Sequence, residues 1–300
     1  MSFYSRAGRH KNIFSKKIII AAASFIIAAA AFFSQTQVSP SFGESLQFHA
    51  IDVGQGDSFL FMFPDRKTIL VDAGTKDGGS KVVRYLKSRG IDKIDLLVAT
   101  HGHSDHIGGM PEVIDNFEIG KVWDSGFNHG SSIQKNFYLT IKKNNIPFGR
   151  PKRGYAENFG GAEIEVLAPA GKFIRGTASD TNNNSLVFLL RYGKVAFLMT
   201  GDMERAERAS ISPLPYAAIL KAAHHGSSNG TDRTLLKQTK PSLVILSYAR
   251  ENSYGFPHRE VVSALKKSGA GRIDTADGDI IIETDGKSIT YPSERLVLSK

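Results

Sequence analysis

THGHSDHIGGM, at residues 100–110, holds three of the chain's nine histidines and one aspartate within six positions. Because side chains two residues apart in extended backbone point to the same side, His101 and His103 are predicted to reach one cation. Asp105 and His106 come after a bend and are predicted to face a second position a few ångströms away. Imidazole and carboxylate ligands together suit Zn²⁺, Mn²⁺ or Fe²⁺, so this segment predicts a metal site.

One segment cannot complete two metal sites, so further ligands are expected after other predicted strands. Asp202 follows the apolar run VAFLMTG, and a carboxylate at such a strand end is well placed to bridge two metals; a helix N-cap is its alternative role. His224 and His225 follow ILKAA, and since adjacent side chains of a strand point to opposite sides, only one is predicted to bind metal. His258, in NSYGFPH, is either a ligand or the first residue of a helix.

Alternating strand and helix patterns surround these segments and predict the fold class. Strands are expected at residues 46–53, 58–63, 68–71, 95–99, 162–167, 185–191, 195–200, 219–223, 242–247, 279–283 and 288–291. Helices are expected at residues 81–88, 111–117, 131–143, 204–210, 231–238 and 258–268. The first three strands suggest an antiparallel meander. The mixture predicts one α/β domain with two sheets, not a parallel doubly wound sheet.

Composition limits the chemistry. The chain of 300 residues is 41% hydrophobic and 22% charged, which is ordinary for a globular protein. It contains no cysteine, which excludes disulfide bonds, thiolate zinc sites and a thiol nucleophile. The net charge is +9, and five basic residues before the first acidic residue, Glu44, supply +5 of it. Subtracting them leaves +4 for residues 44–300, which is only mildly basic.

The N-terminal region has the pattern of a targeting segment. A basic n-region (residues 1–17) precedes the uncharged stretch IIIAAASFIIAAAAFF (residues 18–33), which is either a signal peptide or a membrane anchor. A buried core helix is the alternative. Residues 34–44 are predicted to be a linker, and residues 45–300 the folded domain. Because positive charge stays inside, we expect an extracytoplasmic domain, secreted or anchored to the cell membrane.

Several stretches occur together that are typical of one family. They are FHAIDVGQGD (residues 48–57), TILVDAG (68–74), THGHSDHIGG (100–109), NNNSLVFLL (182–190), TGDM (200–203), LKAAHHGSS (220–228), NSYGFPHRE (252–260) and DG (277–278). With this ordered set the chain resembles the metallo-β-lactamase superfamily. Within it, the chain is most similar to the extracytoplasmic hydrolase domain of ComEC-type competence proteins, in its stand-alone form.

The resemblance implies an αββα sandwich of two mixed sheets flanked by helices, here preceded by the N-terminal apolar helix. It also implies two divalent metal ions, Zn or Mn, at one edge between the sheets. Carried over position by position, the metal residues are His101, His103, Asp105, His106, Asp202, His225 and His258. Asp72 is expected to brace the metal loop rather than to bind metal.

Two positions depart from the family pattern. The only histidine between the first motif and Asp202 is His129, outside the expected place, where residues 182–185 read NNNS. One metal site is therefore expected to be weaker, or completed by asparagine or water. Phe256 stands where the family often has histidine, which leaves His258 as the available imidazole.

Function follows from the charge of two cations, which lower the pKa of a shared water toward about 7. The prediction is an exported metal-dependent hydrolase that uses a metal-bound hydroxide, with Asp105 and Asp202 as catalytic residues. The favoured hypothesis is a phosphodiesterase or nuclease acting on single-stranded DNA or a small phosphodiester. The alternatives are hydrolysis of a lactone, thioester or β-lactam, and a non-catalytic surface module that binds DNA.

Basic residues are the local support for the DNA hypothesis. Arg150, Lys152 and Arg153 lie together in RPKRG, and Arg272 lies near the C-terminus. Ordinary solvated surface charge is an equally good interpretation of these four residues. Membrane contact is expected through the N-terminal segment alone, since the chain has a single long apolar stretch.

Overall fold

A computed structural model describes Met1 and residues 43–297 of the chain. The predicted n-region from residue 2 onward, the apolar segment at residues 18–33 and nearly all of the linker lie outside the described residues. No helix in the part of the chain that is described is long and apolar enough to cross a membrane.

Two mixed sheets form the centre of the domain. The first contains, in sheet order, β15 (Ile289–Thr290), β14 (Ile280–Thr284), β1 (Leu46–Ala50), β2 (Phe59–Met62), β3 (Thr68–Val71), β4 (Lys93–Ala99), β5 (Glu118–Asp124) and β6 (Phe148–Gly149). The second contains β13 (Gly271–Asp274), β12 (Leu243–Leu246), β11 (Ile219–Lys221), β10 (Val195–Met199), β9 (Val187–Tyr192), β8 (Ala162–Ala168) and β7 (Ala156–Phe159). The predicted antiparallel meander is confirmed, because β1, β2 and β3 pair in that way.

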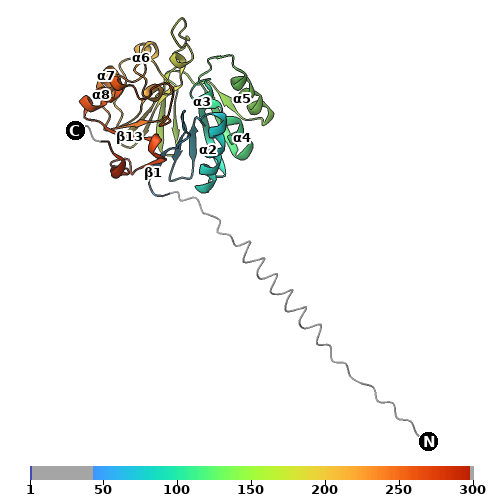
Figure 1. The fold of residues 1–300 in the computed structure, drawn as a ribbon. Coiled ribbons are helices and arrows are strands. Elements are labelled where there is room, and N and C mark those ends of the chain that lie inside the picture. The colour runs from blue at the N-terminus through green and yellow to red at the C-terminus, as the bar shows by residue number, and fades with distance from the viewer. Residues whose placement is uncertain (2–42, 298–300) are drawn as a thin grey trace. The chain divides into compact units, whose positions relative to one another are not determined.

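Helices cover the outer face of each sheet (Figure 1). The helices beside the first sheet are α2 (Lys76–Ser88), α3 (Ser104–Ile107), α4 (Met110–Asn116) and α5 (Ser132–Lys143). Those beside the second are α6 (Arg205–Ile211), α7 (Arg233–Thr239) and α8 (Arg259–Ser268). Short 3₁₀ turns are η1 (Asn182–Asn184), η2 (Ala223–Gly226), η3 (Thr275–Asp277) and η4 (Ser293–Arg295). The result is the predicted sandwich of two mixed sheets between helix layers.

Aromatic side chains fill the space between the two sheets. Phe48 of β1 and Phe61 of β2 pack with ring centroids 4.9 Å apart, and Phe197 of β10 lies 5.4 Å from both. The alternate residues of β2, Leu60 and Met62, face the helices instead and join a second buried cluster. Both faces of the central strands are therefore buried, which explains why these strands read as continuous apolar runs.

Some elements differ from the sequence-based expectation. Helix α2 begins at Lys76 and not at residue 81, because the Thr75 side chain caps it by accepting a hydrogen bond from the Gly78 amide. Strands β5, β6, β7 and β13 were not predicted, and β5 directly follows a helix without a turn signal. Gly78 and Gly79, which precede the predicted helix, are buried inside the first turn and a half of α2.

Gly109, at the start of α4, permits a close approach of α2. A Cβ on Gly109 would lie 2.2 Å from the Ala73 carbonyl oxygen and 2.6 Å from the Gly79 Cα, and both contacts are with backbone. The loop that follows the histidines is therefore held tightly against α2.

We expect Gly109→Ala to reduce the free energy of unfolding by about 1–3 kcal/mol, because the added methyl group overpacks this backbone contact. Urea unfolding followed by the fluorescence of Trp123 measures the change. Gly171→Ala is the matched control, because nothing lies within 4 Å of its Cβ position, and it should stay within about 0.5 kcal/mol of wild type. Equal stability of both variants would contradict the packing described here.

Parallel strands of both sheets bring the predicted donor residues to one edge. In the first sheet β3 and β4 are parallel, and in the second β10, β11 and β12 are parallel. The loops after β4, β10 and β11 contain His101, Asp202 and His225 respectively. The carboxyl ends of parallel strands are where open α/β sheets place their ligands.

Candidate metal centre

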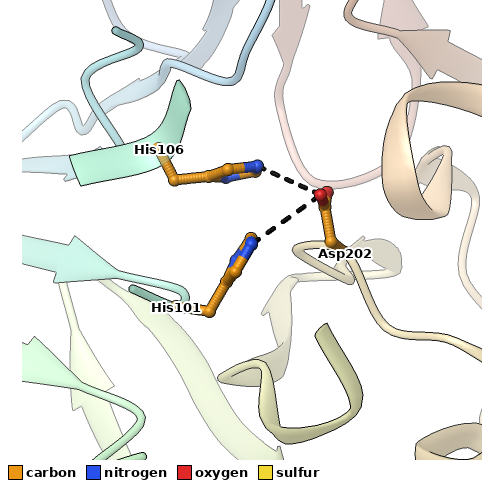
Figure 2. Close-up of side chains that lie close together, drawn as sticks. All are labelled: His101, His106 and Asp202. Atoms are coloured by element: carbon orange, nitrogen blue, oxygen red, sulfur yellow. Dashed lines mark ion pairs between the residues drawn. The ribbon is translucent and has the colours of Figure 1, made fainter. Parts of the chain in front are cut away.

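The first candidate donor group contains His101 and Asp202, which lie beside His106, and His103 adjoins it next to His101. His101 Nε2 lies 3.0 Å from His103 Nδ1 and 3.7 Å from Asp202 Oδ2. Two nitrogens on one tetrahedral zinc ion, each about 2.0–2.1 Å from it, are about 3.3 Å apart. The spacing of the two imidazole nitrogens fits a shared cation, and Figure 2 shows His101 and His106 both directed at Asp202.

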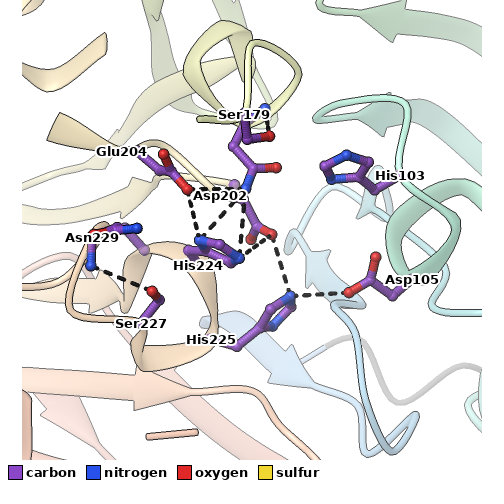
Figure 3. A network of polar contacts seen from close by, with 12 residues as sticks. His103, Asp105, Ser179, Asp202, Glu204, His224, His225, Ser227 and Asn229 are labelled. Atoms are coloured by element: carbon purple, nitrogen blue, oxygen red, sulfur yellow. Dashed lines mark hydrogen bonds and ion pairs between the residues drawn. The ribbon is translucent and has the colours of Figure 1, made fainter. Parts of the chain in front are cut away.

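The second donor group joins Asp105, His106, His225 and Asp202. His106 Nε2 lies 3.3 Å from both His225 Nε2 and Asp202 Oδ2. His225 Nε2 lies 3.3 Å from Asp105 Oδ2 and 3.4 Å from Asp202 Oδ2 (Figure 3). These separations match those of ligand atoms around one tetrahedral ion.

Asp202 Oδ2 belongs to both groups. The same oxygen faces His101 at 3.7 Å, His106 at 3.3 Å and His225 at 3.4 Å. A carboxylate in this position can hold two neighbouring cations and offset their repulsion. Helix α6 begins at Arg205 with Glu204 in the N-cap position, so Asp202 does not cap the helix.

Neighbouring groups turn one ring nitrogen of each buried histidine toward the donor groups. His106 Nδ1 lies 2.8 Å from Asp72 Oδ2, and His225 Nδ1 lies 2.8 Å from the Ser247 carbonyl oxygen. Both partners only accept, so each Nδ1 carries a proton, and Nε2 is the nitrogen whose lone pair can bind a metal once its own proton is released. The hydrogen bonds therefore set the tautomer that a metal ligand requires.

Asp72 acts on the metal loop through Thr100. Its carboxylate accepts hydrogen bonds from the Thr100 amide at 2.9 Å and the Thr100 hydroxyl at 2.6 Å. Since that hydroxyl donates to Asp72, it accepts the proton of His101 Nδ1 at 3.1 Å, which leaves His101 Nε2 free. Asp72 adopts a left-handed φ of 58°. Its contacts with His106 and Thr100 hold the loop that contains the histidines in place.

Asn182 supplies a candidate donor for the first group. Its side chain is buried, and among the described residues its Oδ1 has no hydrogen-bond partner. Its Nδ2 donates to Glu204 Oε1 at 3.3 Å, so the amide is fixed while its oxygen stays available. Asn182 lines one cavity together with His103 and Asp202. A buried carbonyl oxygen without a partner is costly, and a cation would satisfy it.

Burial and opposite charge dominate the electrostatics. Burial alone would raise the pKa of Asp202, but the charges of His225, His106 and His224 outweigh it and hold that pKa well below its usual value. Burial alone would lower the pKa of His106, yet Asp202, Asp72 and Asp105 raise it well above its usual value. Burial would also lower the pKa of His225, but Asp202 and Asp57 outweigh it and raise that pKa well above its usual value. In the metal-free chain the two imidazoles therefore hold protons that a cation must displace.

We expect the affinity for Zn²⁺ to increase with pH across about pH 6–8. Below their raised pKa values His106 and His225 are protonated, so binding releases protons, and affinity gains about tenfold per pH unit for each proton released. Isothermal titration calorimetry in buffers of different ionisation enthalpy measures both affinity and proton release. An affinity that is constant over this range, with no proton release, would contradict the assignment.

Two further residues at this site, Lys221 and Asp57, were not predicted from the sequence. Lys221 Nζ lies 2.6 Å from Asp57 Oδ2 and 3.4 Å from Asp202 Oδ1, and it donates to the Gly201 carbonyl oxygen at 2.8 Å. All three side chains are buried. Burial would lower the pKa of Lys221, but Asp57 and Asp202 outweigh it and raise that pKa. The signal in the sequence was a lysine placed inside an otherwise apolar strand, in ILKAA.

Within the His224–His225 pair, His225 is the residue that lies with the donor groups. His224 instead directs Nδ1 toward Glu204 Oε1 at 3.2 Å, and its Nε2 lies 3.8 Å from Asp202 Oδ2 (Figure 3). Asn183 also donates to Glu204, at 3.1 Å. The two histidines have left-handed φ values of 51° and 53°, a conformation that costs energy and is found at functional sites.

The structure does not bring His258 to the donor groups. His258 Nδ1 accepts from the Ser228 amide at 3.1 Å, and Nε2 lies 3.3 Å from the Tyr254 carbonyl oxygen, so both ring nitrogens are engaged. It is the N-cap residue of α8, the alternative given above. His129, which the sequence placed outside the motif, lines the cavity with its ring 4.8 Å from that of His103.

Among the basic residues considered for DNA contact, Arg272 is already paired. Its guanidinium donates to Asp274 from two nitrogens and contacts the Tyr248 hydroxyl at 3.3 Å. Arg153 donates to the Ser210 carbonyl oxygen at 3.1 Å. These two residues support the local structure, so they do not add to a free basic surface.

A His and Asp donor set at the edge between two sheets, with helices outside, defines an αββα metal-dependent hydrolase. The chain matches the family model described as Metallo-beta-lactamase superfamily over residues 51–250, and it belongs to that superfamily. The metallo-beta-lactamase fold protein YhfI from Bacillus subtilis has a similar fold, with a TM-score of 0.54 at 15% identity over 80% of this chain and all of that one.

Curated relatives include ComEC-type competence proteins. ComE operon protein 3 of Bacillus subtilis is 28% identical over 238 residues, which cover 72% of this chain and 30% of that protein. The chain thus spans less than a third of that relative's length. Exodeoxyribonuclease WalJ of Streptococcus pneumoniae is 27% identical over 186 residues, covering 57% of this chain and 62% of that protein.

Proposed function

We propose that the chain is an exported phosphodiesterase that hydrolyses single-stranded DNA with two divalent cations, Zn²⁺ or Mn²⁺. The observation that carries the proposal is the pair of donor groups that share Asp202 Oδ2. Two-metal sites of this kind suit displacement at phosphorus, because a pair of cations can stabilise both the attacking and the leaving oxygen. The similarity to ComE operon protein 3 and to an exodeoxyribonuclease supports DNA as the substrate.

When bound, the cations lower the pKa of a coordinated water and stabilise negative charge at the attacked centre. Asp202, whose Oδ2 faces His101, His106 and His225, would hold both cations. Asp105 lines the cavity, and its side chain is 25% exposed while those of Asp202 and the buried histidines are at most 3% exposed. Burial would raise the pKa of Asp105, but His106 and His225 outweigh it, so this carboxylate is ionised and can accept a proton from the attacking water.

His224 is placed to give a proton to the leaving oxygen. Glu204 accepts at Nδ1 and turns Nε2 toward the cavity, which His224 lines beside Asp202. Asn182 and Asn183 in turn hold Glu204. The NNNS segment therefore positions the proton donor as well as offering the Asn182 oxygen.

The proposal includes export, which rests on the sequence pattern of residues 1–33 alone. A reporter enzyme that is active only outside the cytoplasm, fused after residue 44, tests it. Activity of the fusion in intact cells supports export, and its loss when residues 1–33 are removed identifies the segment responsible. An inactive fusion would overturn the proposed location without affecting the chemistry.

The substrate is tested with purified protein loaded with Zn²⁺ or Mn²⁺. We expect cleavage of a single-stranded oligonucleotide that stops when a chelator is added, and no turnover of a chromogenic β-lactam or a lactone. Turnover of the carbonyl substrates without DNA cleavage would favour the carbonyl hydrolase instead. DNA binding without any hydrolysis, equal in wild type and Asp202→Asn, would indicate a binding module.

A further inference from the structure

Two stacked aromatic side chains, Tyr254 and Phe256, extend from the candidate metal centre to the surface. Tyr254 and Phe256 are stacked, with ring centroids 5.3 Å apart and planes 12° apart. Phe256 packs in turn against His224 at 5.4 Å and His225 at 6.1 Å. Tyr254 is 61% exposed, which is unusual for a large aromatic residue. Both Tyr254 and Phe256 line the cavity that contains Asp105 and Asp202.

The loop that contains Tyr254 and Phe256 is held in one conformation by hydrogen bonds within the loop. Asn252 accepts from the Phe256 amide at 2.9 Å and donates to the Phe256 carbonyl oxygen at 2.9 Å. His258 accepts a hydrogen bond from the Ser228 amide, and its ring also contacts the Tyr254 carbonyl oxygen. An exposed ring on a fixed loop loses little conformational entropy when a ligand stacks on it. His258 thus acts as a positioning residue for this loop.

The cavity accommodates a single nucleotide unit rather than a duplex. Its volume is about 340 Å³, at the lower end of the range for small-molecule sites. Its walls combine ionisable metal-centre residues with the flat faces of Tyr254 and Phe256. A nucleotide has the matching pair of features, a charged phosphodiester and a flat base, and aromatic side chains bind bases of single strands by stacking without reading their sequence.

We infer that Tyr254, backed by Phe256, forms a nucleobase-binding subsite that stacks the base next to the phosphodiester at the metal centre. This inference rests on the proposed function and narrows its substrate to single-stranded nucleic acid with an intact base beside the cleaved bond. Because stacking does not distinguish bases, the subsite gives little sequence preference. A phosphodiester without a base gains nothing from it.

The test compares two single-stranded oligonucleotides of equal length, one intact and one with abasic residues at both ends. Tyr254→Ser removes the ring and Tyr254→Phe keeps it, while Tyr216→Ser removes another exposed tyrosine, which does not line the cavity. We expect the ratio of kcat/KM for intact over abasic oligonucleotide to fall about 5- to 100-fold in Tyr254→Ser. Tyr254→Phe and Tyr216→Ser should retain the wild-type ratio.

A second measurement does not depend on cleavage. The fluorescence of a terminal 2-aminopurine should be quenched when its oligonucleotide binds the metal-loaded wild type or Tyr254→Phe, and not when it binds Tyr254→Ser. An unchanged kcat/KM ratio together with unchanged quenching in Tyr254→Ser would overturn the subsite. Cleavage of neither oligonucleotide, with quenching that still requires Tyr254, would overturn the nuclease function and leave the base subsite standing.

Discussion

Replacing Asp202 with asparagine should abolish nearly all hydrolysis, with kcat/KM falling about a thousandfold. The single oxygen Oδ2 faces His101, His106 and His225 at 3.3–3.7 Å, so it joins the two donor groups. An asparagine of the same shape keeps an oxygen but loses the negative charge that offsets two neighbouring cations. The variant should therefore bind fewer metal ions than wild type, and not merely turn over slowly.

Steady-state kinetics on the oligonucleotide and metal content after desalting measure the two effects. Asp92→Asn is the matched control, because Asp92 is an exposed aspartate just before β4, at the opposite end of that strand from His101. It should keep wild-type activity and metal content. If Asp202→Asn kept both as well, Asp202 would not be the bridging residue.

Lys221→Met should destabilise the fold by about 3–5 kcal/mol. Lys221 Nζ contacts Asp57 Oδ2 at 2.6 Å, and both side chains are about 1% exposed. Removing the ammonium leaves the Asp57 carboxylate buried without its cation, and that cost exceeds the loss of one hydrogen bond. Urea unfolding in the metal-free state measures the effect directly.

A second substitution tests whether the destabilisation comes from the unpaired charge of Asp57. Lys221→Met combined with Asp57→Asn removes both charges, so the double variant should be destabilised by less than the sum of the single variants. Lys237→Met, at an exposed lysine of α7, should change stability by no more than about 0.5 kcal/mol. A Lys221→Met protein within that same limit would show that the buried pair contributes nothing.

Local patterns in the sequence accounted for much of the fold and the core of the site. Strand β4 is a buried apolar run, and the prediction placed it directly before the histidines. The spacing of His101 and His103 placed both imidazoles on one side, and their nitrogens do lie 3.0 Å apart. Asp202 and His225 were found because they follow buried strands, and parallel strands end at a common edge.

Other features depend on contacts between distant segments, which no local pattern encodes. Asp57 and Lys221 meet only because the loop after β1 and the end of β11 belong to different sheets that pack together. Asn182 lies in the NNNS segment, which departs from the family pattern. Its oxygen can be recognised as lacking a partner only in the structure, where its Nδ2 donates a hydrogen bond to Glu204. For His258 the same stretch of sequence was compatible with a metal ligand and with the start of a helix. Only the hydrogen-bond partners of its two ring nitrogens distinguish these roles.

Anomalous X-ray diffraction from crystals grown with Zn²⁺ or Mn²⁺ tests the two-cation centre most directly. We expect two anomalous peaks, one bound by His101, His103 and Asp202 and one by Asp105, His106, His225 and Asp202. Peaks that avoid these residues, or a single ion held elsewhere in the domain, would contradict it.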